Sequence, residues 1–345
     1  LRTAVSEEQL TGLSFLSFVY PKGKWSFAIY RHQLANFRAQ TDTQGLFHTG
    51  GTGTEVFRSF DRRWSTELDI VSYGAAGAYR INERLSLGLG LVYFEGRLDA
   101  PFEWVFFDDF TVDGIFGPNS YLPQRQLANG DMAFDDSDWG LSAGLFWSFA
   151  KRWSIGAFYR QGPEFNLVFA VRAGAATPVF EPSYTPGESI LVIATPMQFP
   201  DVYGFGIAYR TDDGKLTVGF EWDRVRYSSI FDSFDPVVIE TLEDDLDLGL
   251  ELAADDGDEL RLGAEYALLD LKPVLAIRAG VWLDPDHRFR SISSDPEHQV
   301  LFQPGDDEVH FALGLGLAFG SFQIDLAADF SDLVDTASLS AIYSF

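Results

Sequence analysis

The stretch that most constrains the fold is residues 201–228, which read DVYGFGIAYRTDDGKLTVGFEWDRVRYS. Two runs of alternating residues are joined by a short polar turn that contains Asp213 and Gly214. A period of two is typical of β-strands, and an Asp-Gly turn between two such runs is typical of a hairpin. A soluble sandwich would bury the large apolar face against a second sheet, whereas a membrane barrel would turn it to lipid. That face consists of Tyr203, Phe205, Ile207, Tyr209, Leu216, Val218, Phe220 and Trp222.

The same hairpin pattern recurs along the whole chain. Short connections, near residues 22, 83, 151, 213, 271 and 320, alternate with long ones, near residues 50, 118, 186, 243 and 295, and only the last connection, near residue 333, is short out of turn. Barrels of the bacterial outer membrane have this asymmetry, because their periplasmic turns are short and their outer loops are long. The predicted fold is therefore an all-β, transmembrane, antiparallel up-and-down β-barrel. Its thirteen predicted strands are residues 13–20, 25–37, 67–81, 85–98, 139–149, 153–171, 203–210, 216–223, 259–269, 274–283, 308–319, 322–330 and 336–345.

Strand parity predicts fourteen strands, of which about thirteen are present in the sequence. Single-chain bacterial barrels have an even number of strands, and the first and last predicted strands both run towards the short-turn side. One strand of the opposite direction is thus expected before Leu1, together with any N-terminal plug, and residues 1–345 are expected to form a single barrel domain. The alternative places the extra strand in residues 1–10, but LRTAVSEEQL alternates poorly.

Composition agrees with this fold and excludes several functions. No apolar run approaches the roughly 18 residues of a membrane helix. A mean hydropathy of −0.02 is compatible with a barrel, because the apolar and polar faces of an alternating strand average to a neutral hydropathy. The net charge of −26 argues against a nucleic-acid partner, and the absence of cysteine excludes disulfides and thiolate metal sites. All five lysines lie in short turns, and the acidic runs lie in long loops, which predicts that one rim of the barrel is basic. The alternative is that turns simply tolerate lysine, which would give the same distribution.

The C-terminal strand carries a second signal for the outer membrane. Its apolar face consists of Leu339, Ala341, Tyr343 and Phe345. A chain that ends in Phe, with Tyr two residues before it, resembles the signal read by the outer-membrane assembly machinery. We therefore predict the outer membrane of a Gram-negative bacterium as the location, with a periplasmic C-terminus. The predicted partners are outer-membrane lipids, lipopolysaccharide and the assembly machinery.

Three stretches resemble one family of such barrels, the FadL-type outer membrane proteins that transport long-chain fatty acids and hydrocarbons. They are residues 199–210 (FPDVYGFGIAYR), residues 74–91 (GAAGAYRINERLSLGLGL) and residues 25–37, which are similar to the family's third strand. The resemblance runs along most of the chain, but it rests on strands and turns. The family's plug carries an Asn-Pro-Ala-type motif that this sequence lacks, so the plug's ligand contacts cannot be transferred.

In the resembling family a kink in the third strand opens the wall, and substrate leaves the lumen sideways into the bilayer. Alternation from Trp25 onwards turns the odd-numbered residues of this strand, including Arg31, towards lipid. A charged side chain that faces lipid costs roughly 2–4 kcal/mol at mid-bilayer. Apolar character returns at Leu34 in the other phase, which predicts a bulge or kink. The alternative is that Arg31 already lies near the outer rim. The predicted lateral opening consists of Tyr30, Arg31, His32, Gln33 and Leu34, although a lone histidine such as His32 is more often an ordinary polar residue.

Two predicted long loops, residues 99–138 and 173–200, carry more apolar surface than an exposed loop needs. They either fold into a small cap with its own core or form a hydrophobic capture groove, and both can hold at once. In the resembling family these two loops form the first hydrophobic binding site. The substrate-binding residues predicted on that basis are Phe102, Trp104, Phe106, Phe107, Phe110, Phe116, Tyr121, Ile193, Met197 and Phe199.

Inward-facing charges are predicted to form a network in the lumen, mostly as structural ion pairs. One arginine among them is a candidate for binding a carboxylate headgroup, and the sequence leaves open which one. The acidic stretch 232–259 lacks the ligand spacing of an EF-hand, which favours a solvated surface over an ion site. Catalytic motifs and spaced metal ligands are absent, so no enzyme activity, metal or cofactor is predicted. The predicted lumen charges are Arg160, Arg210, Glu221 and Arg278.

The sequence thus predicts a passive outer-membrane channel for hydrophobic compounds, namely long-chain fatty acids or hydrocarbons. Substrate would be captured on the aromatic outer loops and released laterally through the kinked strand. Two alternatives come from other classes: a barrel subunit or adaptor in a larger outer-membrane complex, which implies a protein partner, and a general diffusion porin, which the aromatic loops disfavour.

Overall fold

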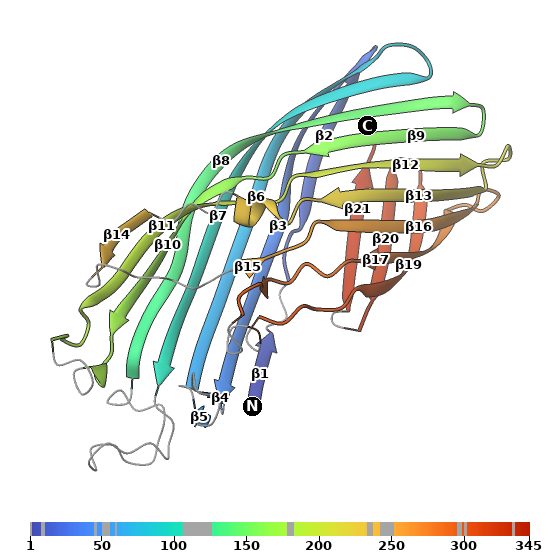
Figure 1. Cartoon of the computed structure of the whole chain (residues 1–345). Coiled ribbons are helices and arrows are strands. Elements are labelled where there is room, and N and C mark those ends of the chain that lie inside the picture. The colour runs from blue at the N-terminus through green and yellow to red at the C-terminus, as the bar shows by residue number, and fades with distance from the viewer. Residues whose placement is uncertain are drawn as a thin grey trace.

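The computed structural model describes residues 2–7, 11–44, 47–49, 56–58, 61–105, 126–177, 183–232, 237–241, 252–294, 299, 302–332 and 335–345. These residues form one antiparallel 17-stranded sheet, two small two-stranded sheets and a short helix, α2 (Ser229–Asp232) (Figure 1). Within these ranges, no helix is both long enough and apolar enough to span a bilayer.

The strands follow the predicted hairpin order. They are β1 (Arg2–Glu7), β2 (Phe15–Lys22), β3 (Trp25–Gln44), β4 (Phe47–Thr49), β5 (Val56–Arg58), β6 (Asp61–Arg80), β7 (Leu85–Val105), β8 (Gln126–Ala150), β9 (Trp153–Arg160), β10 (Glu164–Ala173), β11 (Ser189–Gln198), β12 (Val202–Arg210), β13 (Leu216–Val225), β14 (Val237–Thr241), β15 (Leu252–Ala253), β16 (Gly257–Leu268), β17 (Val274–Asp284), β18 (Arg290–Ser291), β19 (Glu308–Phe319), β20 (Phe322–Phe330) and β21 (Thr336–Tyr343).

The main sheet has thirteen rows, because four pairs of its strands lie end to end: β1 with β2, β9 with β10, β11 with β12, and β13 with β14. This number agrees with the thirteen predicted strands. Residues 1–10 include a short strand, since β1 pairs with the outer part of β3, from Arg2 opposite Gln44 to Glu7 opposite Ala39. It adds no row of its own, because it continues the row of β2.

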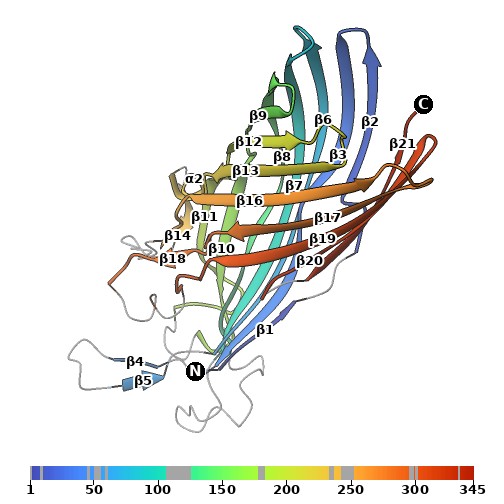
Figure 2. The same cartoon turned by 90° about the vertical axis from the view of Figure 1, so that its right-hand side faces the viewer.

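The two edges of the main sheet are β2 and β21, which share no ladder in the described chain (Figure 2). Both run towards the short-turn end, where Lys22 pairs with Trp25 and Tyr343 pairs with Phe322. Their side chains approach each other where the rings of Phe18 and Phe345 stack at 5.7 Å. Because these two edges run in the same direction, they cannot pair directly as antiparallel neighbours, and the described sheet is not closed.

Two bands of aromatic residues bound an outward apolar belt. The outer band crosses three adjacent strands, where Tyr73 pairs with Tyr93 and Tyr93 with Trp139. Between the bands the outward side chains are leucines and similar residues, of which Leu89 is 72% and Leu141 58% exposed. Apolar side chains this exposed are expected to face lipid, with aromatic girdles at the two interfaces. The inner band, near the short turns, includes Trp25, Tyr79, Trp153 and Tyr209, which form ring contacts.

Several strands continue well past the outer aromatic band. β3, β6, β7 and β8 are 20 to 25 residues long, whereas β16, β17, β19, β20 and β21 have 8 to 12. The outer parts of the four long strands, together with β10, β11 and β14, form a curved outer sheet that extends away from the rest of the wall (Figure 1). The predicted loops 99–138 and 173–200 are therefore shorter than expected. β7 runs to Val105, β8 begins at Gln126, and β11 occupies Ser189–Gln198.

Candidate functional site

The wall has a β-bulge at Leu34, where the sequence pattern predicted a change of phase. The pairing of β3 with β6 shifts between Gln33 and Ala35, and Leu34 is left without a partner on β6. Tyr30, before the bulge, and Ala35, after it, both pack on the same internal cluster. The inward residues of β3 are therefore even-numbered before the bulge and odd-numbered after it. The Gln33 amide bridges the bulge by donating to the Ala35 carbonyl at 3.2 Å and to Asp69 Oδ1 at 2.7 Å.

The other edge of β3 is interrupted at the same level. Its ladder with β2 ends at the pair Phe15–His32, and its ladder with β1 resumes at Glu7–Ala39. Within the described residues, the intervening part of β3 has no strand partner on this edge, and its Gln33 N–H donates to the Ser14 carbonyl at 2.8 Å. The bulge and this interruption lie side by side in the wall.

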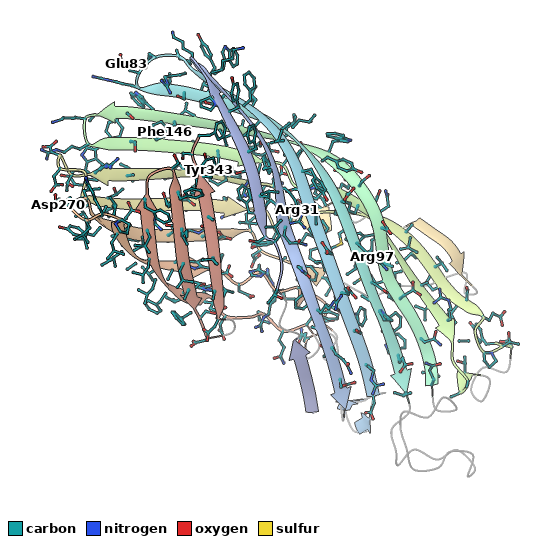
Figure 3. The ribbon with its side chains drawn as sticks, turned by 180° about the vertical axis from the view of Figure 1, so that it is seen from behind. Arg31, Glu83, Arg97, Phe146, Asp270 and Tyr343 are labelled. Atoms are coloured by element: carbon teal, nitrogen blue, oxygen red, sulfur yellow. The ribbon has the colours of Figure 1, made fainter. Side chains whose placement is uncertain are left out.

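Arg31 lies at the level of the outer aromatic band, which favours the alternative interpretation that it is near the outer rim. Arg31, which is labelled in Figure 3, pairs with Tyr73, and Tyr73 pairs in turn with Tyr93 of the outer aromatic band. Its guanidinium donates to the Leu13 carbonyl and to Gln33 Oε1 at 2.7 Å. A charge at the interface costs little, so Arg31 is compatible with an outward position.

A large apolar cluster covers the inner face of the outer sheet. Phe165 is fully buried and stacks on Phe134 with a ring distance of 4.9 Å, and Phe102 is 2% exposed and stacks on Trp64 at 5.2 Å. A Cβ on Gly96 would stand 2.4 Å from the Phe165 ring, so this glycine provides the space for the ring. We call this set the outer cluster; its buried members are Ile70, Val92, Phe94, Leu98, Ala100, Phe102, Ala128, Phe134, Phe165, Leu167, Val171, Leu191 and Ile193.

The predicted capture residues divide between this cluster and the part of the chain that is not described. Phe102 and Trp104 lie in β7, and Ile193 and Met197 in β11, so the expectation that they are loop residues is wrong. Phe102 and Ile193 belong to the buried core of the cluster. Met197 and Phe199 pack on it while remaining partly exposed. Phe106, Phe107, Phe110, Phe116 and Tyr121 lie outside the described residues.

Below the outer aromatic band, small side chains line the interior of the wall. A groove of about 720 Å³ has Ser26, Ala28 and Ala76 among its lining residues. The same groove is bordered by Phe158 and by a group of charged residues, namely Arg160, Glu221, Asp223 and Arg261. Small inward residues and large outward ones leave space inside the barrel.

The charged side chains of the lumen are mostly paired. Arg278 Nε lies 2.7 Å from Glu265, and its Nη1 lies 2.5 Å from Asp325. Glu221 pairs with Arg261 at 3.3 Å. The predicted charges Arg278 and Glu221 thus form structural ion pairs. Arg210 lies at the short-turn end, where it donates to the Gly214 carbonyl at 3.4 Å. Among the described residues, no group of His, Cys, Asp or Glu could hold a metal ion.

Comparison with known proteins identifies the family. The sequence profile of the family described as outer membrane protein transport protein (OMPP1/FadL/TodX) matches residues 52–338. The chain belongs to this family. FadL/TodX members are transport proteins of the outer membrane rather than enzymes, so the predicted location in that membrane and the expected class of function are confirmed. No curated protein matches the sequence.

Solved structures share the fold at low identity. A Pseudomonas aeruginosa FadL homologue is 15% identical, with a TM-score of 0.55 over 93% of this chain and 78% of that chain. The CymD monoaromatic hydrocarbon channel is 16% identical, with a TM-score of 0.54 over 99% of this chain and 86% of that chain. The Ralstonia pickettii toluene transporter TbuX is 15% identical, with a TM-score of 0.50 over 95% of this chain and 78% of that chain.

This FadL/TodX-family chain has two further breaks in its wall that the sequence analysis missed. β9 gives way to β10 around Gly162, and β11 gives way to β12 around Pro200, at the level of the outer band. Asp201 secures both breaks, because its carboxylate accepts from the Gly162 N–H at 2.9 Å and from the Tyr159 hydroxyl at 2.8 Å. The dipeptides Gly162-Pro163 and Phe199-Pro200 were the available signal, since proline removes a ladder donor.

At the start of β10, before its ladder with β8 begins at the pair Val168–Ala133, aspartate side chains of β8 accept the backbone hydrogen bonds. Asp136 accepts from the Asn166 N–H at 3.0 Å and from the Asn166 amide at 2.9 Å, and Asp138 accepts from the Glu164 N–H at 2.8 Å. The hydrogen bond from the Asn166 backbone, more than any other contact, lowers the pKa of Asp136 below its usual value. Both carboxylates lie beyond Trp139 and hence outside the membrane belt.

Proposed function

We propose that this member of the FadL/TodX family is a passive channel that takes up hydrophobic compounds and releases them sideways into the outer membrane. The observation that carries the proposal is the coincidence at Leu34 of a bulge on one edge of β3 with an interrupted ladder on the other. A wall strand that is fully paired on both edges cannot let a molecule pass. A segment with slipped pairing on one side and no strand partner among the described residues on the other can do so more easily.

The outer cluster supplies the first part of the route. Its partly exposed members Met197 and Phe199 lie where β11 ends and the lumen begins, and Phe199 contacts both Phe134 and Phe165. An apolar compound that leaves water at this point gains roughly 25 cal/mol for each Å² of apolar surface buried. Tyr30 packs against the same cluster from β3, so the cluster extends to the proposed opening.

The proposal includes an orientation. Short turns on the side of Glu83 and Asp270 would face the periplasm, and the outer sheet would face the medium (Figure 3). The C-terminal strand would then end in the periplasm, where the assembly machinery can bind Phe345. The exposed apolar belt would contact lipids, and the acidic outer side would lie near lipopolysaccharide.

Deletion of Leu34 tests the lateral opening. Removing this residue lets β3 pair with β6 without a bulge, whereas Leu34→Ala keeps the extra residue and serves as the matched control. Both variants are compared with the wild type in cells that lack their own hydrophobe transporter, with radiolabelled toluene and oleate as probes and with folded protein in the outer membrane quantified. We expect uptake to fall at least about tenfold in the deletion variant and to stay near wild type in Leu34→Ala.

Uptake that survives the deletion in a correctly folded protein would overturn lateral release. Wild-type protein that takes up neither probe faster than empty cells would overturn the transport proposal as a whole. In that case, a large single-channel conductance would indicate a general porin, and copurification of a stoichiometric partner would indicate a subunit of a larger complex.

A further inference from the structure

Three rings lie together on the lumen side of the wall, where the ladder between β2 and β3 ends. Phe15 and His32 form the last pair of that ladder, and their rings meet edge to face at 5.9 Å. The Phe15 ring also stacks on the Tyr30 ring at 6.3 Å. Tyr30 packs on the outer cluster and therefore points inward, and the pair Phe15–His32 shares this inward face by alternation. We call Phe15, Tyr30 and His32 the aromatic border, since the interrupted edge of β3 begins directly beyond them.

Tyr30 is the member of the aromatic border that a compound on the proposed route meets first. Its ring packs on the outer cluster on one side and on Phe15 on the other. A compound that moves along the cluster towards the opening therefore has to pass this ring. Because the ring takes volume from the passage, its position limits the size of the compounds that can pass.

The position of the Tyr30 ring depends on a glycine. Gly74 of β6 is the cross-strand partner of Tyr30. A Cβ on Gly74 would overlap the Cζ, Cε1 and hydroxyl oxygen atoms of Tyr30, so the ring lies directly against the backbone of β6. A larger residue at position 74 would displace the ring from the wall towards the lumen, because an added methyl group in a filled space forces its neighbours to move. Gly74 thus provides a notch that keeps the ring close to the wall.

The backbone around the aromatic border is held by hydrogen bonds, which leaves the side chains to set the width of the passage. The Ser72 hydroxyl donates to the His32 carbonyl at 3.2 Å, and the Gln33 N–H donates to the Ser14 carbonyl at 2.8 Å. The inward residue that follows the bulge is Ala35, which is small. The bulk at this point of the passage therefore comes from the aromatic border.

We propose that Tyr30 determines the size selectivity of the lateral opening, and that Gly74 holds its ring against the wall so that slim compounds can pass. Flat molecules can slide along the faces of Phe15 and Tyr30, because aromatic faces favour stacked contacts. Compounds with bulky branches around a ring are excluded, since they cannot lie flat on these faces. This inference rests on the proposed lateral release and names the side chain that limits its substrates.

A pair of apolar probes that differ in bulk tests the role of Tyr30. Initial uptake of radiolabelled toluene and of triisopropylbenzene is measured in cells that lack their own hydrophobe transporter and express the full chain, with folded protein in the outer membrane quantified. We expect wild type to prefer toluene, and Tyr30→Ala to raise uptake of the bulky probe relative to toluene about tenfold. Tyr30→Phe should behave as wild type, because the ring rather than the hydroxyl fills the passage. Tyr30→Leu, which preserves apolar packing on the cluster, should give an intermediate ratio and serves where Tyr30→Ala does not fold.

Gly74→Ala is the complementary variant. Its methyl group should push the Tyr30 ring into the passage and lower toluene uptake per folded molecule about tenfold, and the double variant with Tyr30→Ala should restore uptake. Gly88→Ala is the matched control, because it also adds a methyl group beside the lumen groove, where the Cβ would lie 3.7 Å from the Ala78 Cβ, an ordinary van der Waals distance. Its uptake should equal that of the wild type.

The outcomes separate this inference from the transport proposal. Toluene uptake by the wild type together with an unchanged probe ratio in Tyr30→Ala and Tyr30→Leu would overturn the role of Tyr30 and leave transport intact. A loss of uptake in Gly74→Ala that Tyr30→Ala does not restore would overturn the role of Gly74 as the notch. A wild type that takes up both probes equally well would refute size selectivity. Uptake of neither probe by the wild type would refute transport, and the inference with it.

Discussion

Replacement of Phe165 by alanine is the sharpest test of whether the outer cluster is a packed core. The side chain is fully buried, stacks on Phe134 at 4.9 Å and contacts Phe199 at 5.5 Å. Truncation of a buried phenylalanine costs about 3–5 kcal/mol, and two aromatic contacts place the expected loss in the upper half of that range. We therefore expect Phe165→Ala to lower the free energy of unfolding by about 4 kcal/mol. Uptake per folded molecule should remain near wild type, because substrate cannot reach a residue that is fully buried.

The assay is urea-induced unfolding of the purified protein in lipid vesicles, combined with uptake normalised to folded protein. Val168→Ala is the control on the same strand, because that side chain is 37% exposed and its loss should cost less than about 1 kcal/mol. Phe199→Ala, at the lumen end of the cluster, should instead reduce uptake of apolar compounds. A loss of less than 1 kcal/mol in Phe165→Ala would refute the packed core. If uptake fell as far in Phe165→Ala as in Phe199→Ala, substrate would reach Phe165 and the cluster would be an open groove.

Two further predictions follow from the same outer region. Gly96→Val should lower the free energy of unfolding by about 2–4 kcal/mol, because a Cβ at this position would stand 2.4 Å from the Phe165 ring. In the same unfolding assay, the double variant with Phe165→Ala should lose less than the sum of the two single variants. Asp136 has a pKa below its ordinary value of 3.8, so its hydrogen bonds to Asn166 stabilise the fold at neutral pH, and this stabilisation is lost as the pH falls through about 4 towards the lower folded-state value. After correction for the intrinsic exchange rate, hydrogen exchange at the Asn166 amide should accelerate over that pH range. Asp136→Ala should remove this pH dependence. Wild-type exchange that follows only the intrinsic rate would contradict the prediction.

Much of the wall could be predicted from the sequence because lipid imposes a strict alternation. Hairpin turns, strand order and the thirteen rows depend on local patterns, and the structure confirms them. The ends of the long strands could not be predicted in the same way. Past the outer band, residues such as Phe102 and Ile193 no longer alternate with the phase of the membrane belt, so the sequence pattern predicts loops where the chain forms the ends of β7 and β11. The pairing state of each lumen arginine depends on side chains from distant strands, which no local pattern reveals.

The bulge at Leu34 shows how the wall meets two solvents. In the membrane belt large side chains must point outward to lipid, as Phe205 does with 48% exposure. In the outer sheet water surrounds the wall, so large side chains must point inward, as Phe165 and Ile193 do with 0% and 4% exposure.

A strand that crosses this boundary has two ways to make the change. In β7 the pattern of side chains changes while the pairing stays in register. The large outward residues are odd-numbered up to Tyr93, and the large inward residues are even-numbered from Phe94 to Phe102. β3 instead changes its backbone at Leu34, and the breaks at Gly162 and Pro200 do the same for the row of β9 and β10 and for the row of β11 and β12. A change of backbone weakens the ladder and a change of side-chain pattern does not, so the ladder is weakest where the backbone makes the change, and the proposed opening at Leu34 is one of these places.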